Sequence, residues 1–457
     1  MARDTTDLTP IENRNQLVEW MVAGCKPKES WRIGTEHEKF GYRTQDYSPI
    51  PYEGPDGIRA LLEGMQNALG WEPITDEGRI IGLVDSGGKG AISLEPGGQF
   101  ELSGAPLEAI HDTCRESNHH LATVKSVAEP LGISFLGVGG SPLWTLEETP
   151  RMPKSRYAIM SRYMPKVGSR GLDMMYRTAT IQVNLDFASE ADMRRKLQVG
   201  LKLQPMASAL FARSPFSEGK PNGLLSWRSQ IWLDTDNQRA GFHPFMLEAS
   251  FSFERYAEWA LDLPMYFVIR EGKYHDCTHV TFRQFMNGAL KDSVPDGMPN
   301  VGDWNNHLTT LFPDVRLKRY LEMRGADGGP WRDICALPAF WVGLLYSEAS
   351  LAAAEQLTAN WTAEMVASMR AEVPAKGLEA EIGGRKLLDF AKEAIAISAM
   401  GLHERNRLND TGNDERLFLA PLEETVATGL TPAERMLRRF EGPWQGDVKR
   451  LFDEYRY

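Results

Sequence analysis

The sequence predicts an α+β fold built on an antiparallel sheet, rather than a doubly wound α/β fold. Strand-like runs come in pairs instead of alternating with helices in a βαβ rhythm; residues 92–104 are one such pair, joined by the turn signal Pro96-Gly97-Gly98. The chain has no Walker loop and no G-x-G-x-x-G motif, which argues against the commonest nucleotide-binding folds. Its 457 residues, 42% of them hydrophobic, are enough to bury a large core.

The periodicity of the apolar residues places the expected helices and strands. Helices are expected over residues 11–24, 55–70, 105–132 and 190–212, and a further helix is expected to begin at Pro432. Gly70 is expected to end the second helix, Ser189 to cap the fourth, and Thr431 with Glu434 to form a capping box. Strands are expected over residues 31–43, 92–104, 133–140, 178–187 and 320–324. From about residue 330 the pattern is mostly helical, and we expect residues 1–457 to form a single catalytic domain.

Composition and charge argue against several classes of function. Asp and Glu number 62 against 51 Lys and Arg, a net charge of −11, so a nucleic-acid or anionic membrane surface is not the expected partner. The start of the chain has no apolar core of a signal peptide and no Arg-rich transit sequence, and no run of 18 apolar residues occurs. We therefore expect a cytoplasmic enzyme that acts on small molecules.

Four of the predicted strands carry polar side chains on one face. Side chains two residues apart in a strand point the same way, so each pair shares a face. These pairs are Glu36 with Glu38, Gln99 with Glu101, Gln182 with Asn184, and Glu322 with Arg324; Glu95 lies just before the Pro-Gly-Gly turn. A solvent-exposed sheet face would give the same alternation in any one of these strands.

If these strands are neighbours, five carboxylates converge. Two carboxylates ~5 Å apart repel by roughly 3 kcal/mol at an effective dielectric of 20. Either some of them are protonated with raised pKa values, or cations compensate them. Oxygen ligands without clustered Cys or His favour Mg²⁺ or Mn²⁺, and a carboxylate site with a neighbouring Arg suits phosphoryl transfer.

Five long segments together resemble one known family, the plant-type glutamate–cysteine ligases of plants and proteobacteria. The segments are residues 33–42, IGTEHEKFGY, and 93–104, SLEPGGQFELSG, followed by 163–187, 317–346 and the closing 429–437, GLTPAERML. The resemblance implies a glutamine-synthetase-like fold, in which a curved antiparallel sheet forms an open funnel with helices outside. It also implies a reaction in which ATP phosphorylates the glutamate side chain and the amine of cysteine displaces the phosphate, giving γ-glutamylcysteine for glutathione biosynthesis.

The resemblance also implies residue roles. It agrees with the strand analysis on two or three Mg²⁺ ions held by Glu36, Glu38, Glu95, Glu101 and Glu322. Arg324, with Glu36 and Glu322, takes the catalytic role at the transferring phosphate, and Lys89 is an expected ATP contact. Arg156 and Arg228 are the candidates for the glutamate α-carboxylate; a surface salt bridge is the alternative for each. Met174, Met175 and Thr178 fall at the family's cysteine pocket, with plain core packing as the alternative, and Gln182 is a further substrate-binding candidate.

The cysteines follow the family only in part. Cys114 and Cys335 stand where it has a redox-responsive disulfide, and two buried unreactive thiols are the alternative. Cys277 lacks the partner of a second, plant-only disulfide, and this point together with the missing transit sequence favours a bacterial, cytoplasmic member. We expect a monomer or a redox-sensitive homodimer. His119 and His120 have no third ligand nearby in the sequence, so we expect a solvated or capping role for them rather than metal binding.

Other functions fit the same carboxylates. Another carboxylate–amine ligase would keep the sheet and change the acceptor pocket, and a guanidino phosphotransferase of the same fold would transfer phosphate without forming a peptide. A carboxylate-pair glycosidase would need no ATP, and a binding protein would have no turnover.

Overall fold

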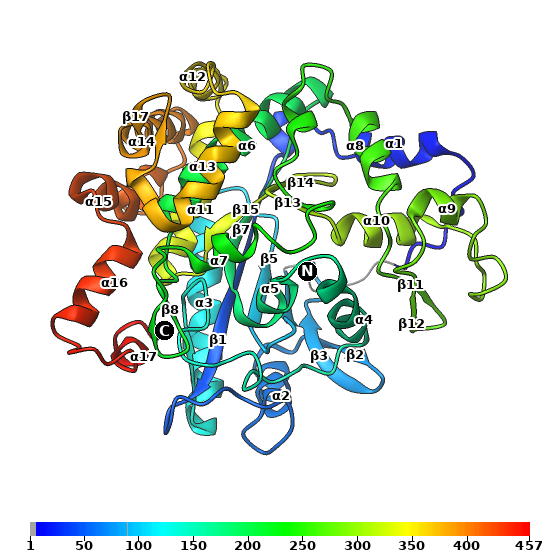
Figure 1. Ribbon diagram of the computed structural model, residues 1–457, viewed down its shortest axis with the longest axis horizontal. Helices are drawn as coiled ribbons and strands as arrows, with labels where there is room; N and C mark the ends of the chain where they lie inside the picture. The colour runs from blue at the N-terminus through cyan, green and yellow to red at the C-terminus, as the bar shows by residue number, and fades with distance from the viewer. Residues whose placement is uncertain (1–5, 89) are drawn as a thin grey trace.

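The sheet is the scaffold of the molecule. The computed structural model describes residues 6–88 and 90–457. Within them, a nine-stranded sheet runs in the order β14-β15-β7-β1-β5-β4-β3-β2, and β6 pairs with the far half of β1. Neighbouring strands of this sheet are antiparallel, and its two ends do not meet (Figure 1). The predicted α+β fold with an open antiparallel sheet is confirmed.

The strands of the sheet are β1 (Ile33–Arg43), β2 (Glu72–Asp76), β3 (Arg79–Val84), β4 (Gly90–Leu94), β5 (Phe100–Gly104), β6 (Ile133–Leu136), β7 (Thr180–Leu185), β14 (Val315–Leu317) and β15 (Leu321–Asp327). Short two-stranded ladders join β8 (Phe216–Ser217) to β9 (Lys220–Pro221), β10 (Ala240–Gly241) to β13 (Phe312–Pro313), β11 (Phe267–Arg270) to β12 (Lys273–Asp276), and β16 (Glu381–Ile382) to β17 (Arg385–Lys386).

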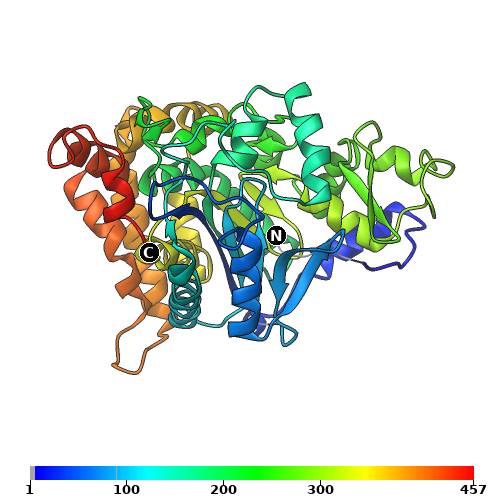
Figure 2. The same ribbon diagram turned by 90° about the horizontal axis from the view of Figure 1, so that it is seen from below.

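The α-helices are α1 (Arg14–Val22), α2 (Ile58–Leu69), α3 (Ile110–Ala128), α4 (Ser155–Tyr163), α5 (Gly171–Arg177), α6 (Glu190–Leu210), α7 (Trp227–Ile231), α8 (Phe253–Leu261), α9 (Phe282–Met286), α10 (Val301–Thr309), α11 (Trp331–Leu345), α12 (Glu348–Leu357), α13 (Ala363–Lys376), α14 (Leu387–Arg405), α15 (Ala420–Thr428), α16 (Pro432–Glu441) and α17 (Arg450–Glu454). The elements after residue 330 are almost all helices, and they gather on one side of the sheet (Figures 1 and 2).

Local sequence signals place the ends of several helices. The Ser189 hydroxyl accepts from the Asp192 N–H, and Thr431 forms its capping box with Glu434. Gly70 takes a left-handed conformation, with φ of 68°, directly after α2. These helix ends are confirmed as predicted.

The two faces of the sheet have different roles. Ile33, Ile181, Val183 and Met323 point to the rear, where they join the largest hydrophobic core together with residues of α6 and α11. The alternate residues of the same strands point to the front, toward α4, α5 and α7. Because a strand alternates its side chains, the core on the rear face fixes which polar residues meet on the front face.

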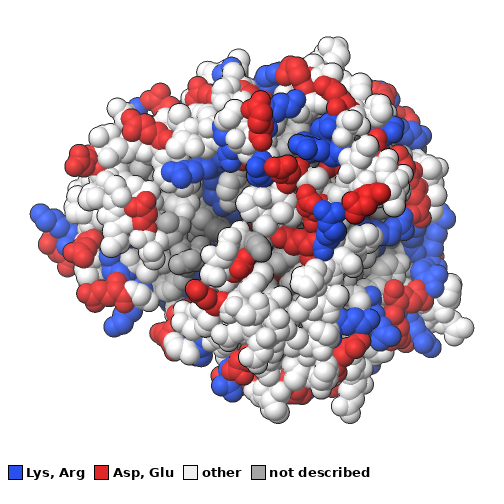
Figure 3. Space-filling view, turned by 180° about the vertical axis from the view of Figure 1, so that it is seen from behind, with Lys and Arg blue, Asp and Glu red and all other residues white. Residues whose placement is uncertain are grey.

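Among the described residues, no single helix is long and apolar enough to cross a membrane; α11 and α12 pass that test only as a pair bent by 91°. On the face seen in Figure 3, acidic and basic side chains are interspersed rather than separated into patches of one sign.

Candidate active site

A row of polar side chains crosses the front of the sheet. Directly paired residues of an antiparallel ladder have their side chains on the same face. The pairs in this row are Glu322 with Asn184, Gln182 with Glu36, Glu38 with Glu101, and Glu101 with Ser93. Four strands that are distant in sequence, β15, β7, β1 and β5, therefore bring together the carboxylates that the alternation placed on one face.

Hydrogen bonds hold individual carboxylates of this row. Asn184 Nδ2 donates to Glu36 Oε1 over 2.8 Å, and the Thr180 N–H donates to Glu38 Oε2 over 2.9 Å. The Ser93 hydroxyl donates to Glu101 over 2.5 Å. These contacts fix where each carboxylate lies before any substrate is present.

The carboxylates raise one another's pKa values. Burial and then the charge of Glu322 raise the pKa of Glu36. Burial, followed by Glu95 and Glu101, raises the pKa of Glu38 well above its usual range, and burial with Glu101 raises the pKa of Glu95. Ionising all of them is costly without compensating positive charge, so this donor set fits a hard divalent cation.

Within the described part of the chain, no three acidic, His or Cys side chains lie close enough together to share one metal ion. This arrangement is compatible with Mg²⁺, which proteins usually hold through one or two carboxylates together with substrate phosphates. The row therefore offers pairs of carboxylates along the sheet rather than one closed cage.

Glu322 differs from the other carboxylates because cations surround it. Arg316, on the neighbouring strand β14, donates to both Glu322 oxygens, with Nη2 at 2.6 and 2.7 Å, and Arg324 Nη1 also donates to Glu322. Burial alone would raise the pKa of Glu322, but Arg316, Arg324 and Lys318 outweigh it and hold that pKa well below its usual range. Glu322 is fully buried, and a metal ion would have to compete with these arginines for it.

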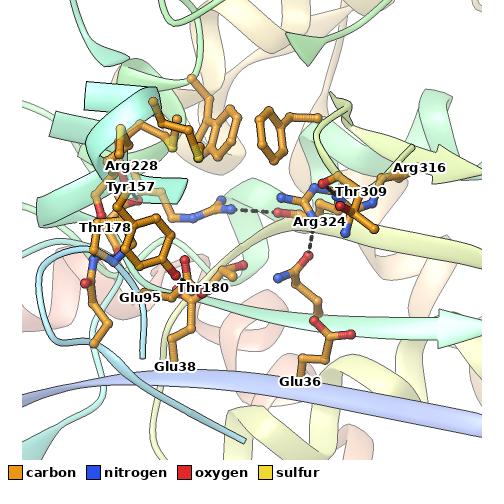
Figure 4. Close-up of a pocket in the computed structure, with 18 of the residues that line it drawn as sticks. Glu36, Glu38, Glu95, Tyr157, Thr178, Thr180, Arg228, Thr309, Arg316 and Arg324 are labelled. Carbon is orange, nitrogen blue, oxygen red and sulfur yellow. Dashed lines mark hydrogen bonds between the residues drawn. The ribbon is translucent and has the colours of Figure 1, made fainter. Parts of the chain in front are cut away.

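Arg324 is positioned at the edge of the pocket. Its Nη1 also donates to Gln182 Oε1 over 2.6 Å, so the guanidinium is fixed by Glu322 on β15 and by Gln182 on β7. The pocket is lined by residues from the sheet, the turn after β4, the helices α4, α5, α7 and α10, and the strand β13 (Figure 4). They include Glu36, Glu38, Glu95, Gln99, Arg156, Tyr157, Met174, Met175, Thr178, Thr180, Gln182, Arg228, Trp232, Thr309, Phe312, Arg316 and Arg324. Positive groups thus face the acidic row across one cavity.

Arg228 reaches the pocket from the short helix α7. Ser226 caps this helix by accepting from the Ser229 N–H over 3.1 Å. Asp327, at the end of β15, accepts from the hydroxyls of Ser226 and Ser214 over 2.8 and 2.7 Å, and Ser214 in turn accepts from the Arg228 N–H over 3.2 Å. A buried carboxylate therefore holds the first turn of the helix that carries Arg228.

Arg156 and the methionines form the other wall. Arg156, on α4, is 6% exposed, and its guanidinium lies 5.2 Å from the centre of the Phe267 ring. Met175 and Thr178 lie at the end of α5, both buried. Gln99 ties this end of α5 to the sheet, since its Nε2 donates to the Thr178 carbonyl over 2.8 Å.

The Pro-Gly-Gly turn makes this contact possible. A Cβ atom on Gly97 would lie 2.3 Å from the Tyr176 carbonyl oxygen, so only glycine allows the turn to approach α5 this closely. The turn thereby places Glu95 and Gln99 beside the α5 wall.

The structure brings most of the predicted site residues into one pocket: Glu36, Glu38, Glu95, Arg156, Met175, Thr178, Gln182, Arg228 and Arg324 line it. Glu101 and Glu322 lie in the same row and are fully buried. Lys89 lies outside the described residues.

Sequence reasoning missed several residues of the site. Thr180 lies two residues before Gln182 on β7, so the alternation of that strand could have indicated it. Arg316 lies on β14, which the sequence analysis did not predict as a strand. Tyr157, whose hydroxyl donates to the Leu94 carbonyl over 2.7 Å, and Asp327 had no local signal.

The prediction for His120 is wrong. His120 is 5% exposed, and its Nε2 lies 2.9 Å from Lys39 Nζ, behind the carboxylate row. Burial lowers the pKa of Lys39 to about 7 and lowers that of His120 well below its usual range. Helix α3 faces the sheet rather than solvent at this position, so the pair is part of the packing against β1.

Cys114 and Cys335 form a disulfide, as the family resemblance implied. Their Cα atoms are 5.6 Å apart, and the bond joins α3 to α11 across 221 residues of sequence. Cys25 and Cys277 are not bonded to another cysteine among the described residues.

Comparisons with known proteins identify the family of this chain. The model of glutamate-cysteine ligase family 2 matches residues 32–454. The chain is 54% identical over 456 residues to glutamate–cysteine ligase A, chloroplastic, of Oryza sativa subsp. indica, covering 100% of this chain and 90% of that protein. It is 55% identical over 444 residues to the chloroplastic glutamate–cysteine ligase of Nicotiana tabacum, covering 97% of this chain and 83% of that one.

A solved structure shows the same fold at low identity. The glutamate–cysteine ligase of Francisella tularensis, solved in complex with AMP, superposes with a TM-score of 0.53 at 12% identity, over 90% of this chain and 85% of that one. The family match over nearly all of the sequence, and the identity above one half to two plant enzymes along almost their whole length, lead to one conclusion: this chain belongs to glutamate-cysteine ligase family 2.

Proposed function

We propose that this protein joins the γ-carboxylate of glutamate to the amine of cysteine at the expense of ATP. The observation that carries the proposal is the pocket itself: in a chain of this family, a row of carboxylates with raised pKa values faces Arg228 and Arg324 across one cavity. The carboxylates are suited to bind cations, and the arginines opposite them are suited to bind anions. Such a pocket fits a nucleoside triphosphate with its metal ions together with an amino acid.

Mg²⁺ bound together with ATP would neutralise the charge of the phosphates. Glu36, Glu38 and Glu95 are the residues that would hold two or three such ions, because burial and mutual repulsion leave them short of positive charge. Glu101 is the fourth candidate: burial would raise its pKa, but the Ser93 hydroxyl and the charge of Lys154 help to lower that pKa to about 2, so it is already ionised. Glu322 is the fifth candidate, and its partners Arg316 and Arg324 already supply cations to it.

The reaction takes place in two steps, phosphoryl transfer and then amide formation. The glutamate γ-carboxylate attacks the γ-phosphorus of ATP, the bond from that phosphorus to the β-bridging oxygen breaks, and ADP leaves. The amine of cysteine then attacks the acyl carbon, loses a proton, and expels inorganic phosphate. Arg324, held by Glu322 and Gln182, is positioned to bind the phosphoryl oxygens as their charge shifts.

The other residues bind the two amino acids. Arg228 and Arg156 would hold the glutamate α-carboxylate, because a guanidinium fork matches the two oxygens of a planar acid. Met175 and Thr178, with Met174 beside them, form a buried wall suited to the thiol of cysteine. Lys89 stays a predicted ATP contact.

The test is product analysis on the purified full-length chain. We expect ADP release that requires glutamate, cysteine and Mg²⁺ together, with one equivalent each of inorganic phosphate and γ-glutamylcysteine found by mass spectrometry. ADP formation that is equally fast without cysteine would contradict the proposal. A phosphorylated acceptor without inorganic phosphate would indicate a phosphotransferase instead.

Location and assembly are tested separately. A cytoplasmic location, and a monomer or redox-sensitive homodimer, stay predictions. Light scattering with and without reductant measures the oligomeric state.

A further inference from the structure

Two short helices carry different parts of the substrate pocket. The helix α5 ends at Arg177, directly before Thr178, and α7 begins at Trp227, directly before Arg228. Thr178 and Arg228 line the pocket, whereas their neighbours Arg177 and Trp227 lie behind its surface, 4% and 6% exposed. The two helices pack together on the front of the sheet (Figure 1). A contact between Arg177 and Trp227 therefore sets how far apart these two parts of the pocket lie.

The contact between Arg177 and Trp227 is a cation–π stack. The guanidinium carbon of Arg177 lies 4.7 Å from the centre of the Trp227 ring. A cation within about 6 Å of an indole ring is attracted by the negative face of the ring, and the attraction is stronger when both partners are removed from water. Because both side chains are buried, the stack holds α5 to α7 more firmly than an exposed ion pair would.

Trp227 also rests on the segment that pairs with Thr178. A Cβ atom on Gly140 would lie 2.8 Å from Trp227 Cε3, so the ring lies directly on the backbone of Gly140. Gly140 in turn forms an antiparallel bridge with Thr178. The ring of Trp227 therefore meets the last residue of α5 through Arg177, and the residue after α5 through Gly140.

Two carboxylates hold the guanidinium of Arg177 in place. Its Nη1 donates to Asp173 Oδ1 over 3.0 Å within α5, and its Nη2 lies 3.1 Å from Glu218 Oε1. Glu218 lies in the turn between β8 and β9, and 45% of its side chain is exposed. An ion pair with an exposed carboxylate contributes little, so we expect the Trp227 ring to be the contact that locates Arg177 relative to α7.

The distance between α5 and α7 matters for the second step of the proposed reaction. The amine acceptor lies against α5 and glutamate is held from α7, so the amine reaches the acyl carbon only when the two helices keep their separation. A displacement of about 1 Å is enough to slow such a reaction strongly. If the amine is misplaced, water attacks the acyl carbon instead, which expels inorganic phosphate and regenerates glutamate. ATP is then consumed without the formation of a peptide.

We propose that Arg177 and Trp227 are positioning residues that align the amine acceptor with the activated glutamate and thereby couple ATP consumption to peptide formation. This inference rests on the proposed ligase function and adds to it two residues behind the pocket. Neither residue touches a substrate in this assignment, because Arg177 acts through Thr178 and Trp227 acts through Arg228.

The test uses Arg177→Met, which keeps much of the side-chain length and removes the cation. We expect the cysteine KM to rise about fivefold, and the ratio of ADP to γ-glutamylcysteine to rise from one to about two, because the amine is less well aligned. The KM for ATP and for glutamate should stay within about twofold of wild type.

Arg170→Met is the matched control. Arg170 directly precedes α5, is exposed, and pairs over 3.0 Å with the same Asp173 that Arg177 contacts. This variant should keep one ADP per peptide and leave the KM values for cysteine, glutamate and ATP within about twofold. An equal rise of the ADP ratio in Arg170→Met and Arg177→Met would overturn the assignment to the stack.

Two further variants separate the stack from the other contacts of Arg177. Glu218→Gln removes the charge that Arg177 meets outside the stack, and it should leave the ADP ratio at one. Arg177→Lys keeps a cation near the ring, and it should show less than half of both changes seen in Arg177→Met. An Arg177→Met protein that unfolds at lower denaturant but still forms one peptide per ADP would have lost only stability, which would overturn the proposal.

Trp227→Phe keeps the proposal testable if Arg177→Met does not fold. Its smaller ring weakens the stack, so the cysteine KM and the ADP ratio should both rise measurably, the KM by about twofold. Wild-type values of both parameters in Trp227→Phe would overturn the inference. Wild-type protein that makes no γ-glutamylcysteine would instead refute the proposed function.

Discussion

Arg228 is linked to the strand β15 through both its side chain and its backbone. Its side chain donates from Nη2 to the main-chain carbonyl of Arg324 over 2.8 Å. Its backbone N–H reaches the Asp327 carboxylate through the hydroxyl of Ser214. The arginine assigned to glutamate is therefore located by the same strand that holds the arginine assigned to phosphate.

This relationship predicts that Asp327 acts through Arg228. In Asp327→Asn an N–H₂ group replaces one of the two acceptor oxygens, so one of the serines loses its hydrogen bond and the first turn of α7 loosens. We expect the glutamate KM to rise about tenfold, close to 1.4 kcal/mol, with cysteine and ATP less affected. Arg228→Lys should change the same parameter, because it loses the guanidinium fork.

Double-mutant kinetics measure the coupling. The combined variant should lose clearly less than the sum of the two single effects, since both act on one contact. Asp333→Asn is the control: Asp333 is buried and pairs with Arg213, so this change should lower stability without a selective effect on glutamate. Strictly additive effects of Asp327→Asn and Arg228→Lys would count against the link.

Burial and the charges of Glu95 and Glu101 raise the pKa of Glu38 well above its usual range. Glu38→Gln keeps the size and the acceptor for the Thr180 N–H but removes the charge that would bind a cation. We expect most of the turnover to be lost, and the Mg²⁺ concentration for half-maximal rate to increase. Glu108→Gln, a change at an exposed residue paired with Arg32, is the control. Turnover within about twofold of wild type, well under 1 kcal/mol of barrier, would remove Glu38 from the cation site.

Alternation along single strands was enough to predict the acidic row. Glu36 with Glu38, and Gln182 with Asn184, needed only the two-residue period to be placed on one face. The order of the strands was not encoded locally, because β15 and β7 are more than 130 residues apart in the chain. Alternation placed Glu322 and Arg324 on one face of their strand, but the pairing of that strand with β7 was only a hypothesis.

Other residues depended entirely on long-range packing. Asp327 has no local signal in the sequence, and it became relevant only because Ser214 and Ser226 lie beside it in the fold. His120 was misjudged for the same reason, since nothing local indicates that α3 turns this residue toward Lys39.

The disulfide predicts a measurable dependence of stability on redox state. Cys114 and Cys335 close a loop of 221 residues, for which the chain-entropy model gives roughly 5 kcal/mol of stabilisation as an upper figure. We expect the double variant Cys114→Ser/Cys335→Ser to unfold at lower denaturant than the oxidised wild type, and to respond no further to dithiothreitol. The control is Cys25→Ser, which leaves the disulfide intact. An unchanged midpoint on reduction, or no cross-linked peptide in oxidised protein, would speak against the pairing.

Glu116 predicts a pH dependence of stability. This residue of α3 accepts from the Ala105 N–H over 2.8 Å, and burial raises the pKa of Glu116 to about 7 from 4.5. Because the folded state holds the Glu116 proton more tightly than the unfolded state does, the full stability is present below the unfolded pKa. This stability is lost as the pH rises through the folded pKa of about 7. The loss amounts to about 3 kcal/mol.

Glu116→Gln removes this loss because the amide does not ionise. We expect the variant to be more stable than wild type at pH 8 and nearly equal to it at pH 5, as measured by urea denaturation at both values. Glu129→Gln, a change at an exposed glutamate just after the same helix, should show no such difference. A Glu116→Gln variant that is destabilised equally at both pH values would contradict the expectation.

The residues proposed for phosphate and glutamate lie on or are held by β15, whereas the wall proposed for the amine acceptor lies on α5. This separation has a consequence for engineering. Glu322, Arg324 and Asp327 lie within six residues of one strand, so a library that randomises this strand alters several functions at once. The wall proposed for the incoming amine acceptor lies on α5, which reaches the sheet through the Gln99 contact and the Gly97 turn. A search for variants that accept a different amine should therefore vary Met174, Met175 and Thr178 and leave the strand untouched. Retained ADP release with a new acceptor would be the sign that the two modules are separable.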